Sequence, residues 1–342
     1  RHRELGYTKG IACMRILLAV QGTGNGHISR AREILRYLRA YGDVDTLVSG
    51  LHSELDIGES WTFAFDGLGF FFGKHGGIDY ARTIRGFHIP RFLKHLRTFP
   101  IQDYDLIIND FEPLTAWAAQ LYHIPCVAMS NQAAFLSRKT PRPPGGPHLA
   151  ELVLRYFAPG SEAIGFHFEQ YDTFIHTPII REEVRRLQPQ RGSHVTIYLP
   201  AHDERAFIKS LERIRDLEWH IFSKQTRTPY EHGRVKVWPV NAERFLTSME
   251  GALGVITAGG FETSAEALFL GKKLLVIPMH GQYEQACNAE ALRRMGVATL
   301  DAVESDFSER VESWLTNDEV IKVDYPDETE MIVADIMRRH KG

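Results

Sequence analysis

The sequence predicts an α/β protein with two Rossmann-like parallel-sheet domains that face a central cleft. Three observations lead to this fold class. The 342 residues are enough for about two domains of ordinary size. Short apolar runs alternate with segments of helical periodicity along most of the chain, as in parallel sheets covered by helices. A glycine-rich turn follows an apolar run in each half, at Gln21–His27 and at Thr257–Phe261. The cleft between two such halves is the expected ligand site.

The first half contains three strand signals separated by helical patterns. The apolar run Arg15–Gln21 predicts a buried parallel strand, and Val44–Ser49 predicts a second one. Ile28–Ala40 between them has apolar residues three and four positions apart, which predicts a helix. The alternation continues with strand Tyr104–Asn109, helix Pro113–Tyr122 and strand Pro125–Ser130.

Proline and glycine mark the boundary between the halves. Ser137–Pro147 contains the run PRPPGGP, which excludes helix and inner strand and predicts a mobile loop. Ile175–Arg191 predicts an interdomain connection, after which the alternation resumes. The expected strands are His194–Leu199, Trp219–Ser223, Leu253–Thr257 and Lys273–Ile277, and the expected helices are Glu204–Arg213, Phe261–Leu270, Tyr283–Met295 and Glu328–His340.

These elements define a domain organisation. Residues 1–13 are polar and are expected to be a tail, with Met14 as the natural start. The expected units are an N-terminal domain over 14–175, a linker over 176–191, a C-terminal domain over 192–325, and a C-terminal helix over 326–342 that packs back on the N-terminal domain.

Composition excludes several function classes. With a net charge of −3, the chain lacks the basic excess of nonspecific nucleic-acid binding. Its three cysteines, Cys13, Cys126 and Cys287, are far apart, which argues against a disulfide framework or a zinc site and favours a reducing compartment. No apolar run reaches the roughly 18–20 residues that span a bilayer. We therefore expect a cytoplasmic protein, either free or docked at the inner face of the membrane.

The first glycine turn carries the candidate base. Gly22, Gly24 and Gly26 open the helix N-terminus toward a ligand, but the spacing G-x-G-x-G differs from the dinucleotide fingerprint, and no acidic residue ends the next strand. His27 begins the helix and suits a general base, the alternative being capping or packing. Asp110 at the end of a later strand is the candidate partner of His27, although it could instead cap the next helix, and Glu112 is a competitor.

The second glycine turn has the features of a diphosphate cradle. Gly259 and Gly260 expose backbone amides at a helix N-terminus, where Thr263 and Ser264 add hydroxyl groups. Glu266, one turn further along, can accept hydrogen bonds from a ribose diol. There is no Walker lysine, which excludes an ATPase P-loop, while an ordinary tight turn remains the structural alternative.

The next loop follows the adjacent strand and should lie beside the second turn. Glu284 and Gln285, followed by Asn288, offer hydrogen-bonding groups suited to sugar hydroxyls, although residues at a helix start can also be caps. The spacing of Glu262, Glu266 and Glu284 does not form a metal cluster, so no metal and no further cofactor are expected.

These segments carry a family resemblance that touches both halves from Met14 onward. The run Trp238–Leu292 resembles the donor-binding signature of GT-B glycosyltransferases, both the plant-type UDP-glycosyltransferases of family 1 and the MurG-type enzymes of family 28. The turn Gly22–Ala31 resembles the glycine turn of the same group, and Asp105–Ala119 resembles an uncharacterised bacterial and archaeal branch close to it.

The resemblance implies roles for individual residues. It implies that Glu266 binds the ribose of a uridine nucleotide and that Val240 contacts the base through its backbone. The diphosphate would be held by Gly260, Thr263 and Ser264, the sugar by Glu284 and Gln285, and the proton would be removed by His27 with Asp110. Ala258 and Glu262 depart from the plant form, which has histidine and asparagine there.

The predicted function is therefore an inverting, metal-independent hexosyltransferase that uses a nucleotide sugar, with UDP as the expected nucleotide. The alternatives are a UDP-sugar 2-epimerase and a non-catalytic sugar-nucleotide-binding protein. The acceptor is unknown, with a lipid or cell-envelope molecule as one candidate. A group of aromatic and basic residues in the first half has two interpretations, peripheral docking on an anionic membrane or an ordinary core helix. The group consists of Phe70, Phe71, Phe72, Lys74, Phe87, Arg91, Phe92 and Lys94, with the loop Arg138–Pro147.

Overall fold

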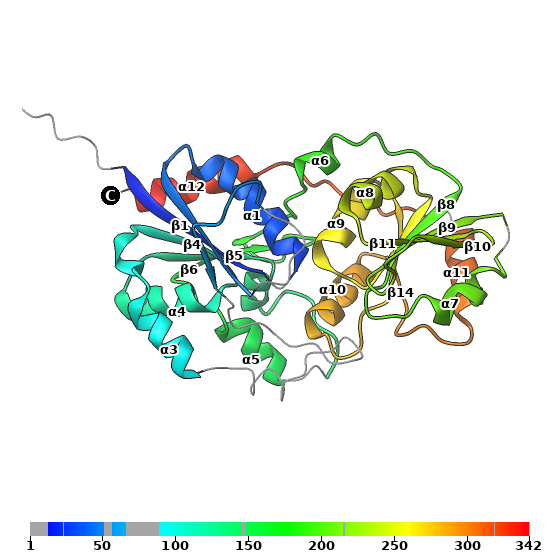
Figure 1. Cartoon of the computed structure of the whole chain (residues 1–342), viewed down its shortest axis with the longest axis horizontal. Helices are drawn as coiled ribbons and strands as arrows, with labels where there is room; N and C mark the ends of the chain where they lie inside the picture. Colours follow the sequence, from blue (N-terminus) through cyan, green and yellow to red (C-terminus); the bar gives the residue numbers. More distant parts are fainter. Residues whose placement is uncertain are drawn as a thin grey trace, which may run out of the picture.

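The computed structural model describes residues 13–22, 24–50, 57–65, 89–145, 148–214, 216–317 and 319–341. Within these ranges the chain forms two α/β domains side by side, each built on a seven-stranded sheet (Figure 1). The tail up to residue 12, the aromatic and basic residues from Phe70 to Phe87, and Gly146 with Pro147 lie outside the described residues.

The first sheet has the strand order β3-β2-β1-β4-β5-β6-β7, and neighbouring strands are parallel. The strand β1 lies next to the central strand β4, and its residues from Ile16 to Val20 are completely buried, because both faces of the sheet are covered by helices. The strands are β1 Met14–Gln21, β2 Gly42–Ser49, β3 Phe63–Phe65, β4 Leu106–Asp110, β5 Cys126–Ser130, β6 Glu162–Phe166 and β7 Ile175–His176.

Helices cover this sheet on two sides (Figure 1). The helix α1 Asn25–Leu38 packs against the C-terminal helix α12 Thr329–His340 on one side, through side chains such as Ile34 and Ile336. The other side carries α3 Ile89–Thr98, α4 Pro113–Tyr122 and α5 His148–Tyr156. The short elements are the 3₁₀ helices η1 Ile101–Asp103 and η2 Gln132–Leu136.

The second sheet has the order β10-β11-β9-β8-β12-β13-β14, in which β10 at the edge is antiparallel to its neighbour. Its strands are β8 His194–Tyr198, β9 Glu218–Ser223, β10 Tyr230–His232, β11 Val235–Pro239, β12 Gly254–Thr257, β13 Lys273–Val276 and β14 Ala298–Thr299. The helices of this domain are α7 Arg205–Leu211, α8 Ala242–Gly251, α9 Phe261–Phe269, α10 Tyr283–Arg294 and α11 Phe307–Thr316.

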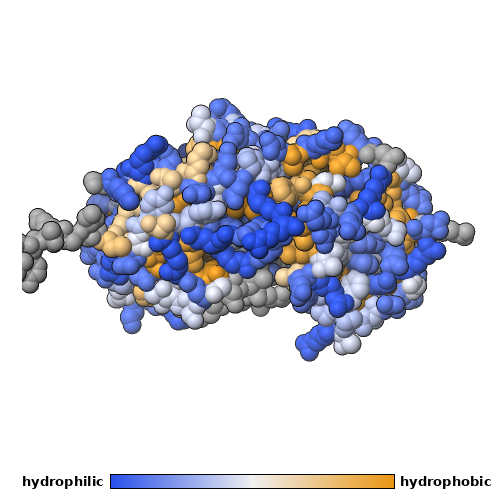
Figure 2. Space-filling view, turned by 90° about the horizontal axis from the view of Figure 1, so that it is seen from above, coloured by the Kyte–Doolittle hydropathy of each residue, from blue (hydrophilic) through white to orange (hydrophobic). Residues whose placement is uncertain are grey.

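The two domains touch directly. The short helix α6 Glu182–Arg185 lies on the segment that joins them, and Phe168 of the first domain packs against Phe261 of the second with ring centroids 5.1 Å apart. Figure 2 shows hydrophilic residues over the middle of the face seen from above, with hydrophobic residues in separate smaller patches. No helix among the described residues is long and apolar enough to cross a membrane.

The predicted elements are present with small shifts at their ends, and others were not predicted. The helix expected at Ile28 begins at Asn25, so that His27 lies inside its first turn. The helix α3 contains Arg91, Phe92 and Lys94, for which a helix was one of the two interpretations. The elements missing from the prediction are β3, η1, η2, α5, β6, β7, α6, β10, β11, α8, β14 and α11, most of them short. Within the segment expected to be a loop, residues 137–145 contain no helix or strand.

Candidate functional site

The first glycine turn places His27 at the end of the sheet that faces the second domain. Gly24 is the N-cap residue of α1, and His27 follows in the first turn with 13% of its side chain exposed. Its Nδ1 atom lies 2.8 Å from Oδ1 of Asp110. Because Nδ1 bonds this carboxylate, Nε2 is left as the basic atom of the neutral imidazole.

Strand pairing explains why these two residues meet. Val20 near the end of β1 is in register with Asp110, the last residue of β4. The carboxyl ends of parallel strands lie at the same edge, so the turn after β1 and the end of β4 are neighbours. Burial lowers the pKa of His27, but the charge and hydrogen bond of Asp110 outweigh it and raise this pKa above its ordinary value.

Glu112 has a different task from Asp110. It is the N-cap residue of α4, where its carboxylate accepts hydrogen bonds from the backbone amides of Leu114 and Thr115 and from the Thr115 hydroxyl. Burial raises the pKa of Glu112 despite these bonds. The partner of His27 is therefore Asp110, and the alternative in which Asp110 caps this helix is wrong.

Arg30 is a member of this site that the sequence did not reveal. One turn after His27, its guanidinium donates to both oxygens of Asp110 at 2.9 and 2.8 Å. It also donates to Oδ1 of Asn131 at 3.1 Å and crosses to the second domain, where Nη1 lies 2.6 Å from Oε1 of Glu262. Its side chain is 2% exposed. Burial raises the pKa of Asp110, but Arg30 and then His27 outweigh it, and the net shift is downward.

The second glycine turn lies opposite the first. Gly259 has φ +76°, a conformation that favours glycine, and Gly260 is the N-cap residue of α9. Thr263 is half-buried in the first turn of this helix. Ser264 is completely buried, and its hydroxyl oxygen has no hydrogen-bond partner in the structure.

Glu266 is already paired. It is 3% exposed, and its two oxygens accept hydrogen bonds from Nε and Nη2 of Arg181 at 2.6 and 2.7 Å. Arg181 comes from the segment that joins the domains, just before α6. This arginine was also missed, because a single basic residue in a predicted linker gives no sign of a partner 85 positions away.

The loop after β13 contributes three further predicted residues. The carboxylate of Glu284 accepts hydrogen bonds from Asn131 at 2.7 Å and from Gln132 at 3.0 Å, both in the first domain. Burial raises its pKa. Gln285 accepts a bond from the backbone amide of Met279, and Asn288 donates to the carbonyl of Gly259 at 3.1 Å.

Val240 lies at a separate hollow of the second domain. This hollow measures about 900 Å³, and its wall includes Trp238, Val240 and Asn241. Two histidines in the same wall, His194 and His220, stack with their ring centroids 3.9 Å apart. Arg244 lies over the ring of Trp238, 5.2 Å from its centroid.

An apolar cavity of the first domain lies beside Phe111, which connects it to the His27–Asp110 pair. Phe111, the residue after Asp110, lies parallel to the imidazole of His27 at a centroid distance of 6.5 Å and adopts a positive φ of 57°. It lines a cavity of about 360 Å³ between α4 and α5, together with side chains such as Trp117 and Tyr156. A bulky residue at positive φ marks local strain, which gathers at functional sites.

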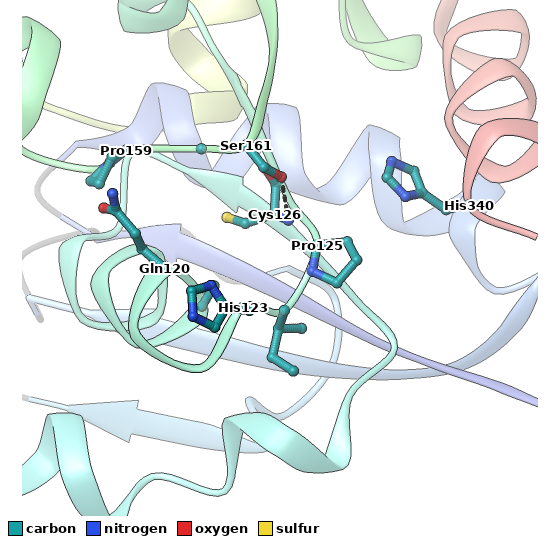
Figure 3. Close-up of a pocket in the computed structure, with 10 residues that line it drawn as sticks. Gln120, His123, Pro125, Cys126, Pro159, Ser161 and His340 are labelled. Atoms are coloured by element: carbon teal, nitrogen blue, oxygen red, sulfur yellow. Dashed lines mark hydrogen bonds between the residues drawn. The ribbon is translucent and has the colours of Figure 1, made fainter.

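A second cavity of about 490 Å³ lies at the C-terminal end of α4. The two share Gln120, Pro159 and Gly160 as lining residues. Figure 3 shows Gln120 extending from α4 toward Pro159, with His123 beside Gln120 and His340 farther away. Both cavities therefore lie beside α4.

The described residues contain no group of three or more histidine, cysteine or acidic side chains placed to hold a metal ion. Two D-x-D sequences, Asp43–Asp45 and Asp103–Asp105, lie at the amino ends of β2 and β4, whereas Asp110 lies at the carboxyl end of β4. Asp45 there accepts a hydrogen bond from the Tyr104 hydroxyl.

Two glycine turns facing each other, with a histidine–aspartate pair on one side, are the arrangement that the sequence resemblance implies. A family model described as glycosyl transferase family 1 matches residues 14–317. The chain belongs to this family. It is a glycosyltransferase with the GT-B fold, and it therefore transfers a sugar.

Solved structures agree with this fold. The glycotransferase of kitacinnamycin matches with a TM-score of 0.60 at 15% identity, over 97% of both chains. LpCGTa in complex with UDP matches with a TM-score of 0.62 at 12% identity, over 97% of this chain and 100% of the other. A glycosyltransferase of Arabidopsis thaliana complexed with UDP matches with 0.59 at 12% identity, over 96% and 94%. Among curated proteins, no sequence matches this glycosyltransferase.

The geometry predicts how His27 titrates. Asp110→Asn removes the charge that raises the pKa of His27, while burial and the charge of Arg30 still lower it. We expect the imidazole pKa to fall below its ordinary value in this variant, as measured by NMR titration of the ring carbon and nitrogen shifts. Glu112→Gln is the control and should leave the His27 titration near that of wild type. An unchanged His27 pKa in Asp110→Asn would contradict the assignment.

Proposed function

We propose that this glycosyltransferase is an inverting, metal-independent enzyme that moves a hexose from a uridine diphosphate sugar to a hydroxyl group. The observation that carries the proposal is the His27–Asp110 pair in the cleft, opposite the N-terminus of α9. UDP in two of the structurally similar proteins supports this nucleotide.

The chemistry follows from the positions of the groups. Nε2 of His27 takes the proton of the acceptor hydroxyl, whose oxygen forms a bond to the anomeric carbon. The bond from that carbon to the diphosphate breaks on the opposite face, and its electron pair leaves with the diphosphate. The amides at the α9 N-terminus and the cation Arg30 stabilise the charge that develops on this leaving group.

Different residues of the second domain would bind the diphosphate, the sugar and the base of the donor. The diphosphate would lie against Gly260 and Thr263, and the sugar against Glu284, while Val240 would border the base. The ribose role proposed for Glu266 requires the diol to share this carboxylate with Arg181 or to replace it, because both oxygens already accept hydrogen bonds.

Replacing the base tests the mechanism. We expect His27→Ala to lower kcat by a factor of about 10²–10⁴, the usual contribution of a general base, while the Kd for UDP stays near that of wild type. His232→Ala, on the edge strand β10, is the control and should keep full activity. Wild-type turnover in His27→Ala would refute the role. Epimerised UDP-sugar formed without any acceptor would instead identify an epimerase.

The ribose role of Glu266 has its own test. Glu266→Gln keeps the size of the side chain but removes the charged acceptor, so the Kd for UDP should rise about tenfold in calorimetric titration. Glu312→Gln on the exposed surface of α11 is the control. Equal UDP affinity in Glu266→Gln and wild type would exclude the role.

The cavity beside Phe111 supports an acceptor with an apolar body. One of its lining residues, Phe111, lies parallel to the imidazole of the candidate base, and three of its lining residues also line the second cavity. The lining residues Trp117 and Tyr156 are exposed, and outside the cavity α4 and α5 expose three further apolar side chains, Leu121, Leu149 and Leu152. We propose that the acceptor is an alcohol whose aromatic or hydrocarbon part occupies this space while its hydroxyl meets His27.

Filling the cavity tests the acceptor class. Ala158 is a half-buried lining residue in a loop, so Ala158→Phe should fill part of the space without disturbing the core. With a panel of phenols and long-chain alcohols, we expect KM for the acceptor to rise about tenfold or more while the Kd for UDP is unchanged. Leu149→Phe, exposed on α5 outside the cavity lining, is the control. An acceptor KM that is unaffected by Ala158→Phe would place the acceptor elsewhere.

A further inference from the structure

Glu262 occupies the space between the two glycine turns. It lies in the first turn of α9, yet its carboxylate crosses the domain boundary and rests on the first turn of α1. A Cβ atom added to Gly26 would collide with this carboxylate. The side chain is 25% exposed, so one side of it is open to solvent and leaves room for rotation.

The carboxylate of Glu262 lies where three positively charged groups attract an anion: two helix N-termini and Arg30. Glu262 belongs to the first turn of α9 and lies against the first turn of α1, and each helix N-terminus carries a partial positive charge. Neither helix has a side-chain cap at its N-terminus. Arg30 adds a full positive charge, with Nη1 at 2.6 Å from Oε1 of Glu262. Such a site suits a group with more negative charge than one carboxylate supplies.

Two buried polar atoms beside the same turn have no partner. The hydroxyl oxygen of Ser264 and Oδ1 of Asn288 are unbonded, in residues that are 0% and 1% exposed. Asn288 is held at the turn by its bond to the carbonyl of Gly259. Buried polar atoms are normally paired, so both are consistent with a ligand at the turn.

We propose that Glu262 is an internal substitute for the donor's diphosphate, and that the diphosphate replaces it as the partner of Arg30 when the nucleotide sugar binds. The inference rests on the proposed function, because it places the diphosphate at α9. It assigns Arg30 as the donor-binding cation of the first domain and Glu262 as the group that competes with the donor.

The exchange reaches both halves of the site through Arg30. The same guanidinium holds both oxygens of Asp110, which orients His27. It also donates to Asn131, whose amide nitrogen donates to Glu284. Donor binding therefore acts on the candidate base and on the sugar-facing carboxylate through one side chain.

The test compares affinities for UDP and for inorganic pyrophosphate by calorimetric titration. Glu262→Gln removes the competing charge but leaves Arg30 paired with Asp110, so we expect both ligands to bind about tenfold more tightly than to wild type. Arg30→Lys should bind both more weakly, and the gain from Glu262→Gln should disappear in the double variant. Glu183→Gln is the matched control, because it removes the carboxylate of the exposed Arg32–Glu183 pair.

The outcomes separate this inference from the proposed donor. If Glu262→Gln gains no affinity for either ligand, or binds them more weakly, Glu262 serves only as a structural brace between the domains and the inference is overturned. If pyrophosphate binds and gains affinity in Glu262→Gln while UDP does not bind, the exchange stands and the uridine donor falls. Thermal unfolding of each variant confirms that it is folded before titration.

Discussion

The buried charge of Arg30 is the interaction on which the site depends. Moving a guanidinium out of water costs several kcal/mol unless it is matched by opposite charge and by hydrogen bonds. Both carboxylate oxygens of Asp110 accept hydrogen bonds from the guanidinium, and Glu262 adds a second carboxylate from the other domain. The end of β4, the first turn of α1 and the first turn of α9 are thereby fixed to one another, and His27 takes its orientation from the same carboxylate.

This arrangement accounts for the acid at position 262, which departs from the plant-type pattern. Two helix N-termini that approach each other repel through their partial positive charges, and Arg30 adds to that repulsion. A cleft of this kind needs an anion between the two turns to stay together. Glu262 supplies it, and because a quarter of its side chain is exposed, it is less firmly held than Asp110, which is 1% exposed.

The sequence predicted those parts that follow from local pattern. Apolar runs and glycine turns located β1, β12 and the helices after them, and parallel pairing then implied that Asp110 and His27 share one edge. The strands β3, β10 and β11 were not predicted. They have three to five residues and lie partly exposed at or beside a sheet edge, so they lack a clear apolar run.

Arg30 and Arg181 were not predicted as site residues, for a different reason. On an amphipathic helix, an arginine three positions after a histidine has the pattern of a solvated surface residue. Its partners lie 80 and 232 positions away, and only the assembled domains bring them within hydrogen-bonding distance. Long-range charge matching of this kind leaves no local signal, although the buried carboxylates at the ends of strands and helices were visible as candidates.

The same logic extends to Glu266 and shapes the energetics of donor binding. In this structure Arg181 is paired with Glu266 and Arg30 with Glu262, so neither carboxylate is an unpaired charge. A donor that met unpaired charges would gain their full electrostatic energy, but the protein without it would be unstable. A cleft whose charges are paired internally is stable, and a ligand binds to it by replacing the internal partners of the two arginines. Such a cleft discriminates by charge and geometry, because a ligand gains only if its own groups satisfy the two arginines better than the carboxylates do.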